Sequence, residues 1–288
     1  METSIVRADL GRTAIIDANA ILAGARLVAV SRLARAQLAA PAFSIWCQLR
    51  GTTHLDTREG RFRLGPGGWI ALDGESLPTL QAARDGLALG IIIAAPTLPM
   101  PGRVLDHALF PGLGHCPKRD RIITLRVWRE AARWLQSPTP GRSACLDPVL
   151  MHLSSLQREI HRDFHRCPGK SSGRKAKVFR RLQRARLFLE GNGDRIVGLD
   201  ELARQASFSR WYLSKTFQAT YGESLQAASR RIRISRACRL LAETSLSICD
   251  VAAHCGFDNP CSFARAFRFE TGMTSTHYRD AHGRELGP

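Results

Sequence analysis

The sequence lacks an apolar run long enough to cross a lipid bilayer. Its longest apolar run, residues 89–95, is interrupted by Gly90, whereas a membrane-spanning helix needs about 20 apolar residues. Residues 1–9 contain early acids and no apolar core of signal-peptide length. These absences favour a cytoplasmic protein with no membrane-spanning segment; a membrane surface is excluded as its partner only by the repeat described below.

Motifs of common catalytic sites are absent too. The sequence contains no G-x-S-x-G, no P-loop G-x-x-x-x-G-K-[ST] and no H-E-x-x-H. His161, His165 and Cys167 lie near Glu159 with a spacing that suits metal ligands on a helix, but the local sequence lacks a complete set of four. We expect no catalytic residues, no metal and no cofactor, with an enzyme in residues 1–165 that is tethered to DNA as the alternative.

The cysteines lack the regular spacing of a disulfide framework. In a chain without an export signal this favours reduced thiols, most of them small core residues. The eight cysteines stand at positions 47, 116, 145, 167, 238, 249, 255 and 261.

Acidic residues are too few to balance the basic ones. The 42 Lys and Arg against 25 Asp and Glu give a formal net charge of +17, which favours an anionic partner. Residues 170–288 hold 21 Lys or Arg and 11 Asp or Glu, with the highest density in residues 174–186, where seven cations occur without an acid. We expect this segment, Arg181 included, to contact phosphate.

The N-terminal half contains the predicted strands. They are separated by turn residues, among which Gly65–Gly68 is the strongest breaker because glycine permits positive φ and Pro66 presets a turn. We expect a small β-sandwich or barrel. The predicted strands are residues 43–49, 61–64, 69–72 and 87–95.

Two helices are predicted next, over residues 121–136 and 146–165. The second has an apolar stripe that fits either a dimer seam or packing within its own domain. Residues 167–173 have the composition of a linker. The predicted fold class is α+β, with an N-terminal domain over residues 1–166 and an all-α domain over residues 174–288.

The C-terminal region contains one pattern twice, about fifty residues apart. The copies run over residues 202–217 and 251–267. In each copy a small residue, Ala203 or Ala252, permits two helices to approach closely, and two apolar residues four apart share one buried face. Each copy is therefore predicted to be a helix-turn-helix motif whose opposite face meets double-stranded DNA.

Local signals mark where the second helix of each copy begins. Ser209 is placed to cap the first of these recognition helices, and Asn259, followed by Pro260, is placed to cap the other. Gly256 supplies the positive φ of the second turn. In the first copy, Ser207 stands at the turn, where a left-handed conformation costs energy.

A third helix is predicted between the copies, over residues 224–242. Its length of roughly 28 Å makes it a rigid spacer that holds two recognition helices near the ~34 Å of one DNA turn. Its arginines cannot all face one core, so we expect some on phosphates and at least one, with Arg233 as the candidate, in an internal salt bridge. These arginines are Arg230, Arg231, Arg233, Arg236 and Arg239.

Residues 178–279 resemble the AraC/XylS family of transcription regulators, whose DNA-binding domain has two helix-turn-helix motifs joined by a long helix. The chain departs from the family pattern at Ser207, where glycine is usual, at Ser275, where proline is common, and at Pro260, which replaces a polar residue. The matching positions are Ala203, Ser209, Leu213, Phe217, Arg233, Ala237, Leu240, Leu241, Ile248, Ala252, Gly256, Phe257, Phe263, Phe267, Gly272, Tyr278 and Arg279.

The resemblance implies that Trp211, Ser214 and Lys215 occupy the base-contacting positions of the first recognition helix. In the second helix only Arg265 has full hydrogen-bonding reach among the corresponding residues, so we expect the first helix to discriminate bases more strongly. The predicted DNA-binding residues are Arg210, Trp211, Ser214, Lys215, Asn259, Cys261, Arg265, Arg268 and Arg181.

The resemblance also implies a cupin-like N-terminal barrel that binds a small-molecule effector or forms a homodimer. His54 is the one histidine near the predicted strands, so the paired histidines of a metal-binding cupin are absent. By the same resemblance, the protein is expected to activate transcription with RNA polymerase as a partner. A constitutive DNA-binding regulator without an effector is the alternative.

Overall fold

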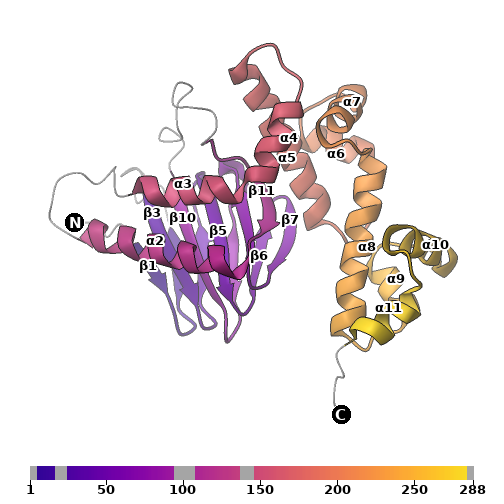
Figure 1. Cartoon of the computed structure of the whole chain (residues 1–288), viewed down its shortest axis with the longest axis horizontal. Coiled ribbons are helices and arrows are strands. Elements are labelled where there is room, and N and C mark those ends of the chain that lie inside the picture. The colour runs from indigo at the N-terminus through magenta and orange to yellow at the C-terminus, as the bar shows by residue number, and fades with distance from the viewer. Residues whose placement is uncertain (1–4, 17–24, 94–107, 137–145, 284–288) are drawn as a thin grey trace. The chain divides into compact units, whose positions relative to one another are not determined.

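A computed structural model describes residues 5–16, 25–93, 108–136 and 146–283 (Figure 1). Strands dominate the N-terminal part and helices the C-terminal part, which confirms the predicted α+β class. The chain divides into two compact units, Met1–Leu187 and Phe188–Pro288. No helix in the described ranges is both long and apolar enough to cross a membrane.

The N-terminal unit contains two sheets. The pairs β1–β3 and β2–β4 are parallel, and the other strand pairs are antiparallel. One sheet has the order β1 (Ile5–Ala8), β3 (Ala25–Ser31), β10 (Leu87–Ile93), β5 (Phe43–Arg50), β8 (Gly68–Leu72) and β11 (Gly112–His115). The other has the order β2 (Thr13–Ile16), β4 (Arg35–Leu38), β9 (Thr79–Ala82), β6 (Thr53–Thr57) and β7 (Gly60–Leu64).

The core of this unit includes inward-facing residues of both sheets, with Trp46 on β5 fully buried among them. Trp46 pairs with Gly90 on β10, where a Cβ atom would come within 2.3 Å of the indole ring. Gly90 therefore interrupts the apolar run because the tryptophan occupies the space of a side chain.

The strands predicted over 43–49, 61–64, 69–72 and 87–95 correspond to β5, β7, β8 and β10, although residues 94 and 95 lie outside the described ranges. The turn Gly65–Gly68 connects strands of different sheets. The strands that the structure describes before residue 42, β1 to β4, were not predicted, and neither were β6, β9 and β11. Several of their inward residues are alanines, which give little β-strand signal in a sequence.

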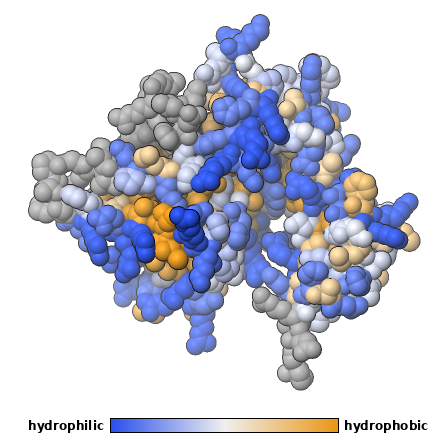
Figure 2. All heavy atoms as spheres, in the orientation of Figure 1, coloured by the Kyte–Doolittle hydropathy of each residue, from blue (hydrophilic) through white to orange (hydrophobic). Residues whose placement is uncertain are grey.

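Helices α2 (Lys118–Gln136) and α3 (Asp147–Leu156) lie across the sheet that contains β5 and β10 (Figure 1). They bury the outward residues of β5, which explains why this strand is buried on both faces. On the face drawn in Figure 2, hydrophilic residues cover most of the surface, and a patch of apolar residues gathers over the strand-rich part.

The helix predicted over residues 146–165 is interrupted. Its parts are α3 and α4 (Arg158–Arg166), separated by the buried Gln157. The side chain of Gln157 accepts a hydrogen bond from the N–H of Phe110 at 3.0 Å and donates one to the carbonyl of Phe110 at 2.8 Å. Four residues of the apolar stripe are buried inside the N-terminal unit: Val149, Leu153, Ile160 and Phe164. This agrees with the alternative in which the stripe packs within its own domain.

Helix α5 (Ser172–Gly191) begins within the segment 167–173 that was predicted as a linker. Its first sixteen residues belong to the N-terminal unit, because Phe179 packs edge-to-face against Phe110 and Phe164 and Leu187 joins the sheet core. The division between the compact units thus falls at 187/188, and the functional domain limits of residues 166 and 174 stay a prediction.

The C-terminal unit consists of short helices around α8. Figure 1 shows α6 and α7 near one end of α8, and α9, α10 and α11 toward the other. The helix bounds are α6 Leu199–Gln205, α7 Arg210–Tyr221, α8 Leu225–Glu243, α9 Ile248–His254, α10 Pro260–Thr271 and α11 Ser275–His282.

Candidate nucleic-acid interface

The first helix-turn-helix motif consists of α6 and α7. The turn places Ser207 in the left-handed region with φ of +50°, as expected where a serine replaces glycine. The Phe208 N–H donates to the carbonyl of Ala203 at 2.9 Å, which closes the turn. Ser209 caps α7 by accepting from the Tyr212 N–H at 3.3 Å, so the predicted cap is confirmed.

The second motif, α9 and α10, repeats these features. Gly256 has φ of +67°, and a Cβ atom there would lie 2.7 Å from Cα of Arg195. The Phe257 N–H donates to the carbonyl of Ala252 at 3.0 Å. Asn259 caps α10 by accepting from the Ser262 N–H at 2.7 Å, and the helix begins at Pro260. Both predictions, the glycine turn and the Asn-Pro start, are confirmed.

Each recognition helix fixes its orientation by burying one apolar stripe. Leu213 and Phe217 of α7 are 0% and 1% exposed, and Phe263 and Phe267 of α10 are both fully buried. The side of each helix opposite these residues therefore faces away from the core.

The outward side of α7 carries the predicted contact residues. Trp211 is 68% exposed, so it does not belong to the core. Lys215 lies one turn further along, with its Nζ 4.8 Å from the centroid of the Trp211 ring. Ser214 is exposed beside them, and Arg210 forms an ion pair with Asp200 of α6.

The outward side of α10 carries Cys261, Arg265 and Arg268, all exposed. At its start, Oδ1 of Asn259 accepts the capping hydrogen bond, and its amide N–H groups are available to another molecule. Phe269 lies on this same side and is 75% exposed, but it is not among the DNA-binding residues that the sequence predicts. Its position four residues after Arg265 is the signal that places it there.

The arginines of α8 are used mainly inside the C-terminal unit. Arg230 pairs with Glu270 at 2.7 Å and Arg231 with Glu223 at 2.8 Å. Arg233 was predicted to form a salt bridge, but it donates instead to the carbonyl of Gly256 at 2.9 Å. Its guanidinium also lies 4.3 Å from the centroid of the Phe257 ring. Arg233 thereby holds the second turn against α8.

The basic segment over residues 174–186 of α5 makes more contacts within the N-terminal unit than the sequence predicted. Four cations there bind carbonyl or carboxylate oxygens, which a net-charge argument cannot foresee. Arg181 lies on the same helix and is half-buried. The four contacts are Lys175 to the His165 carbonyl, Arg180 to the Leu109 carbonyl, Arg184 to Glu75 and Arg186 to Asp163.

The other candidate sites gain no support from the geometry. Within the described ranges, no three His, Cys, Asp or Glu side chains gather in a way that could hold a metal ion. His161 instead contacts the carbonyl of Ala108 at 2.8 Å. Cys255 is fully buried, and burial raises the pKa of its thiol to about 11, whereas Cys249 and Cys261 are exposed.

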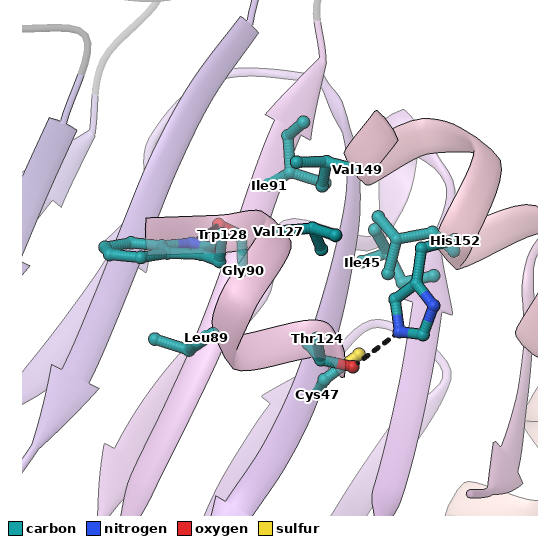
Figure 3. A pocket seen from close by; sticks show the side chains of 11 residues that line it. Ile45, Cys47, Leu89, Gly90, Ile91, Thr124, Val127, Trp128, Val149 and His152 are labelled. Atoms are coloured by element: carbon teal, nitrogen blue, oxygen red, sulfur yellow. Dashed lines mark hydrogen bonds between the residues drawn. The ribbon is translucent and has the colours of Figure 1, made fainter. Parts of the chain in front are cut away.

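A small cavity lies between α2, α3 and the outer side of β5 and β10 (Figure 3). His152 Nε2 and Thr124 Oγ1 are 2.8 Å apart at its edge. The Thr124 hydroxyl also bonds the Asp120 carbonyl, so its one proton goes there and His152 donates to it. Burial lowers the pKa of His152. With a volume of about 10 Å³, the cavity has room for about one water molecule.

The family match lies inside the C-terminal unit. The family described as "Helix-turn-helix domain" matches residues 202–281. The transcriptional activator AarP of Providencia stuartii is 32% identical over 93 residues, which are 32% of this chain and 69% of AarP. The right origin-binding protein of Escherichia coli K12 is 33% identical over 93 residues, about a third of each chain.

Among solved structures, an AraC-type transcriptional regulator from Chromobacterium violaceum is 26% identical, with a TM-score of 0.35. The match covers 41% of this chain and 100% of that one.

Two capped recognition helices on one unit, together with the match to the helix-turn-helix family and to AarP, define a DNA-binding transcription regulator of the helix-turn-helix class. The chain belongs to the AraC family within that class.

Proposed function

We propose that this protein is a sequence-specific transcription activator that acts on DNA in the cytoplasm. The observation that carries the proposal is the pair of outward helix faces, on α7 and α10, within one compact unit that contains α8. The proposal of activation is supported by AarP, whose name describes a transcriptional activator. An activator acts on transcription, so RNA polymerase is the proposed protein partner.

Helix α7 is proposed to enter the major groove through Trp211, Ser214 and Lys215. A lysine that reaches the groove bonds O6 or N7 of guanine, and an aromatic ring contacts the thymine methyl. Because Lys215 lies over the Trp211 ring, the two side chains are partly ordered before DNA binds, which lowers the entropic cost of binding. Arg210, beside them at the start of the helix, is proposed to contact phosphate when its pair with Asp200 opens.

Helix α10 is proposed to enter a second major-groove segment. Arg265 is its guanine-reading residue, since an arginine bonds O6 and N7 together. Arg268, exposed one turn before the end of the helix, is assigned to phosphate, and so are the amide of Asn259 and the start of the helix near Cys261. The phosphate contact proposed for Arg181 comes from the other unit and has the least structural support of the set.

Helix α8 is proposed to set the distance between the two reading faces. It has 19 residues and is therefore about 28 Å long, close to the ~34 Å of one DNA turn. Its internal ion pairs with Glu223 and Glu270 tie it to the residues after α7 and to α10. The proposed consequence is that both recognition helices contact one face of the duplex.

The N-terminal unit is proposed to bind a small effector or to join two chains. The support is its two-sheet core covered by helices, which is compatible with the cupin-like barrel that the family resemblance implies. The cavity of Figure 3 is too small for such an effector, because ligand sites usually measure roughly 300–1,000 Å³. An effector therefore requires a different site or a rearranged unit.

The experiment that tests the proposed function is sequencing of genomic DNA fragments retained by the full chain at moderate salt. We expect a defined motif for the wild type and a loss of preference in Trp211→Ala. The matched control is Trp134→Ala, since Trp134 is 54% exposed on α2 of the other unit. Retention of random fragments by the wild type, or an unchanged motif in Trp211→Ala, would contradict the proposal.

A further inference from the structure

Phe269 is exposed in a way that the fold does not require. At 75% exposure it is the most accessible large apolar side chain of the described residues. The neighbouring aromatic residues Phe263 and Phe267 already fill the core side of α10. An apolar side chain of this size that is left in water is available to contact another molecule.

The position of Phe269 places it on the proposed DNA-reading side of α10. It follows Arg265 by four residues and Cys261 by eight, so the three side chains form one row along the helix. Because Arg265 is the proposed guanine reader, Phe269 lies one turn from a side chain that reaches the bases. The row is exposed at all three positions.

Phe269 is also held in place by a side chain from α8. The guanidinium of Arg230 lies 4.8 Å from the centroid of the Phe269 ring, and its Nε donates to Glu270 at 2.7 Å. The ion pair fixes the guanidinium, and the guanidinium covers one side of the ring. The remaining side of the ring is presented to solvent in a fixed orientation.

The same arrangement occurs once in each motif. On α7 the exposed aromatic is Trp211, with Lys215 at 4.8 Å from its ring. On α10 it is Phe269, with Arg230 at the same distance. Trp211 lies near the start of α7 and Phe269 near the end of α10. The position of the exposed aromatic residue in the first motif therefore does not predict its position in the second.

We propose that Phe269 reads a thymine methyl group in the DNA segment that α10 contacts. The inference rests on the proposed function, because it requires α10 to lie in the major groove. A phenylalanine has no hydrogen-bonding group, and the C5 methyl of thymine is the apolar group that the base edges present there. Phe269 thus adds sequence discrimination to a helix that has only one strong hydrogen-bonding reader, Arg265.

The test uses the duplex selected by the wild-type chain and replaces its thymines with deoxyuridine, one at a time. Deoxyuridine lacks only the methyl group and keeps every hydrogen bond. We expect one position in the α10 half-site to weaken wild-type binding about fourfold, the value of one buried methyl group. For Phe269→Ala we expect weaker binding to the thymine duplex and no response to deoxyuridine at that position.

Two control variants separate the methyl contact from other roles. Phe269→Leu keeps an apolar side chain and should restore part of the methyl response. Arg268→Ala should keep that response but reduce the salt dependence of binding, because it removes a phosphate contact. Both residues are exposed, so circular dichroism and thermal unfolding should match the wild type.

The outcomes distinguish failure of the inference about Phe269 from failure of the proposed function on which it rests. An unchanged deoxyuridine profile in Phe269→Ala overturns the inference, while the function stands as long as Trp211→Ala still loses its motif. Normal DNA binding by Phe269→Ala with loss of activated transcription also overturns it, since the ring would then serve a protein partner. Failure of the wild type to select any duplex is a failure of the proposed function itself.

Discussion

The two helix-turn-helix motifs are built alike on the inside and differently on the outside. Both bury an apolar pair four residues apart, begin the recognition helix with a side-chain cap and end it with a left-handed glycine. Each outward face has one exposed aromatic residue beside a cation, but the other residues and their positions differ, because α7 offers Trp211 and Lys215 and α10 offers Cys261, Arg265 and Phe269. The common interior is what packing requires, and the divergent exterior is where we propose that each motif meets a different DNA sequence.

The turns show a second difference. The first turn places Ser207 in the left-handed region, whereas the second uses Gly256 there. Only the second turn is crowded, since a Cβ atom at Gly256 would meet the backbone of Arg195. Serine is therefore tolerated in the first turn at the cost of some strain, while the second requires glycine.

The largest expected effect comes from truncating the shared interior. Phe217→Ala and Phe267→Ala should each lower the free energy of unfolding of the C-terminal unit by about 3 to 5 kcal/mol, because each leaves a cavity. Denaturant unfolding of both variants measures this. Equal losses of stability in the two variants support a core that is repeated in both motifs. A negligible loss in one variant would show that the two cores are not equivalent.

The next effect comes from placing a serine in the second turn. Gly256→Ser should lower the free energy of unfolding by about 2 to 3 kcal/mol, since it adds left-handed strain to a backbone clash. Denaturant unfolding again gives the value. A cost below that of an ordinary surface substitution would show that the second turn has room, contrary to the contact with Arg195.

The outward faces should differ in how they affect sequence preference. Lys215→Ala and Arg265→Ala should each cost about 1 to 3 kcal/mol of discrimination at a guanine, at different positions of the selected motif. The sequence predicts that α7 discriminates between bases more strongly than α10 does. The methyl contact proposed for Phe269 would make the two helices more nearly equal in this respect. Sequencing of retained fragments checks both, and loss at one shared position would contradict separate reading by the two helices.

The smallest effect has the opposite sign. Ser207→Gly should raise the free energy of unfolding by about 0.5 to 1 kcal/mol, because relief of left-handed strain exceeds the added entropy of the unfolded chain. The same unfolding measurement applies. A loss of stability here would show that Ser207 is not strained, and the two turns would then be equivalent.

Much of the DNA-binding unit could be predicted from the sequence because its signals are local. Caps at Ser209 and Asn259 and the glycine turn at Gly256 depend on neighbouring residues alone. Phe269 was missed because an exposed phenylalanine in an apolar pattern looks like a core residue. Its exposure follows from which stripe the helix buries, and that depends on the packing of the whole unit.

Contacts between distant residues explain the remaining differences. The sequence shows seven cations on α5, but the partners of two of them lie far away in the chain, Leu109 for Arg180 and Glu75 for Arg184. Gln157 likewise interrupts a continuous helical pattern because it bonds Phe110, 47 residues away. None of these partners has a local signal.

The central claim is that α8 holds two reading helices one DNA turn apart. The direct test measures affinity of the full chain for its selected duplex with 5 or 10 base pairs inserted between the two half-sites. We expect an insertion of 5 base pairs, about half a turn, to reduce specific affinity to the level of one half-site, because the second half-site then faces away. Undiminished affinity after that insertion would contradict the claim.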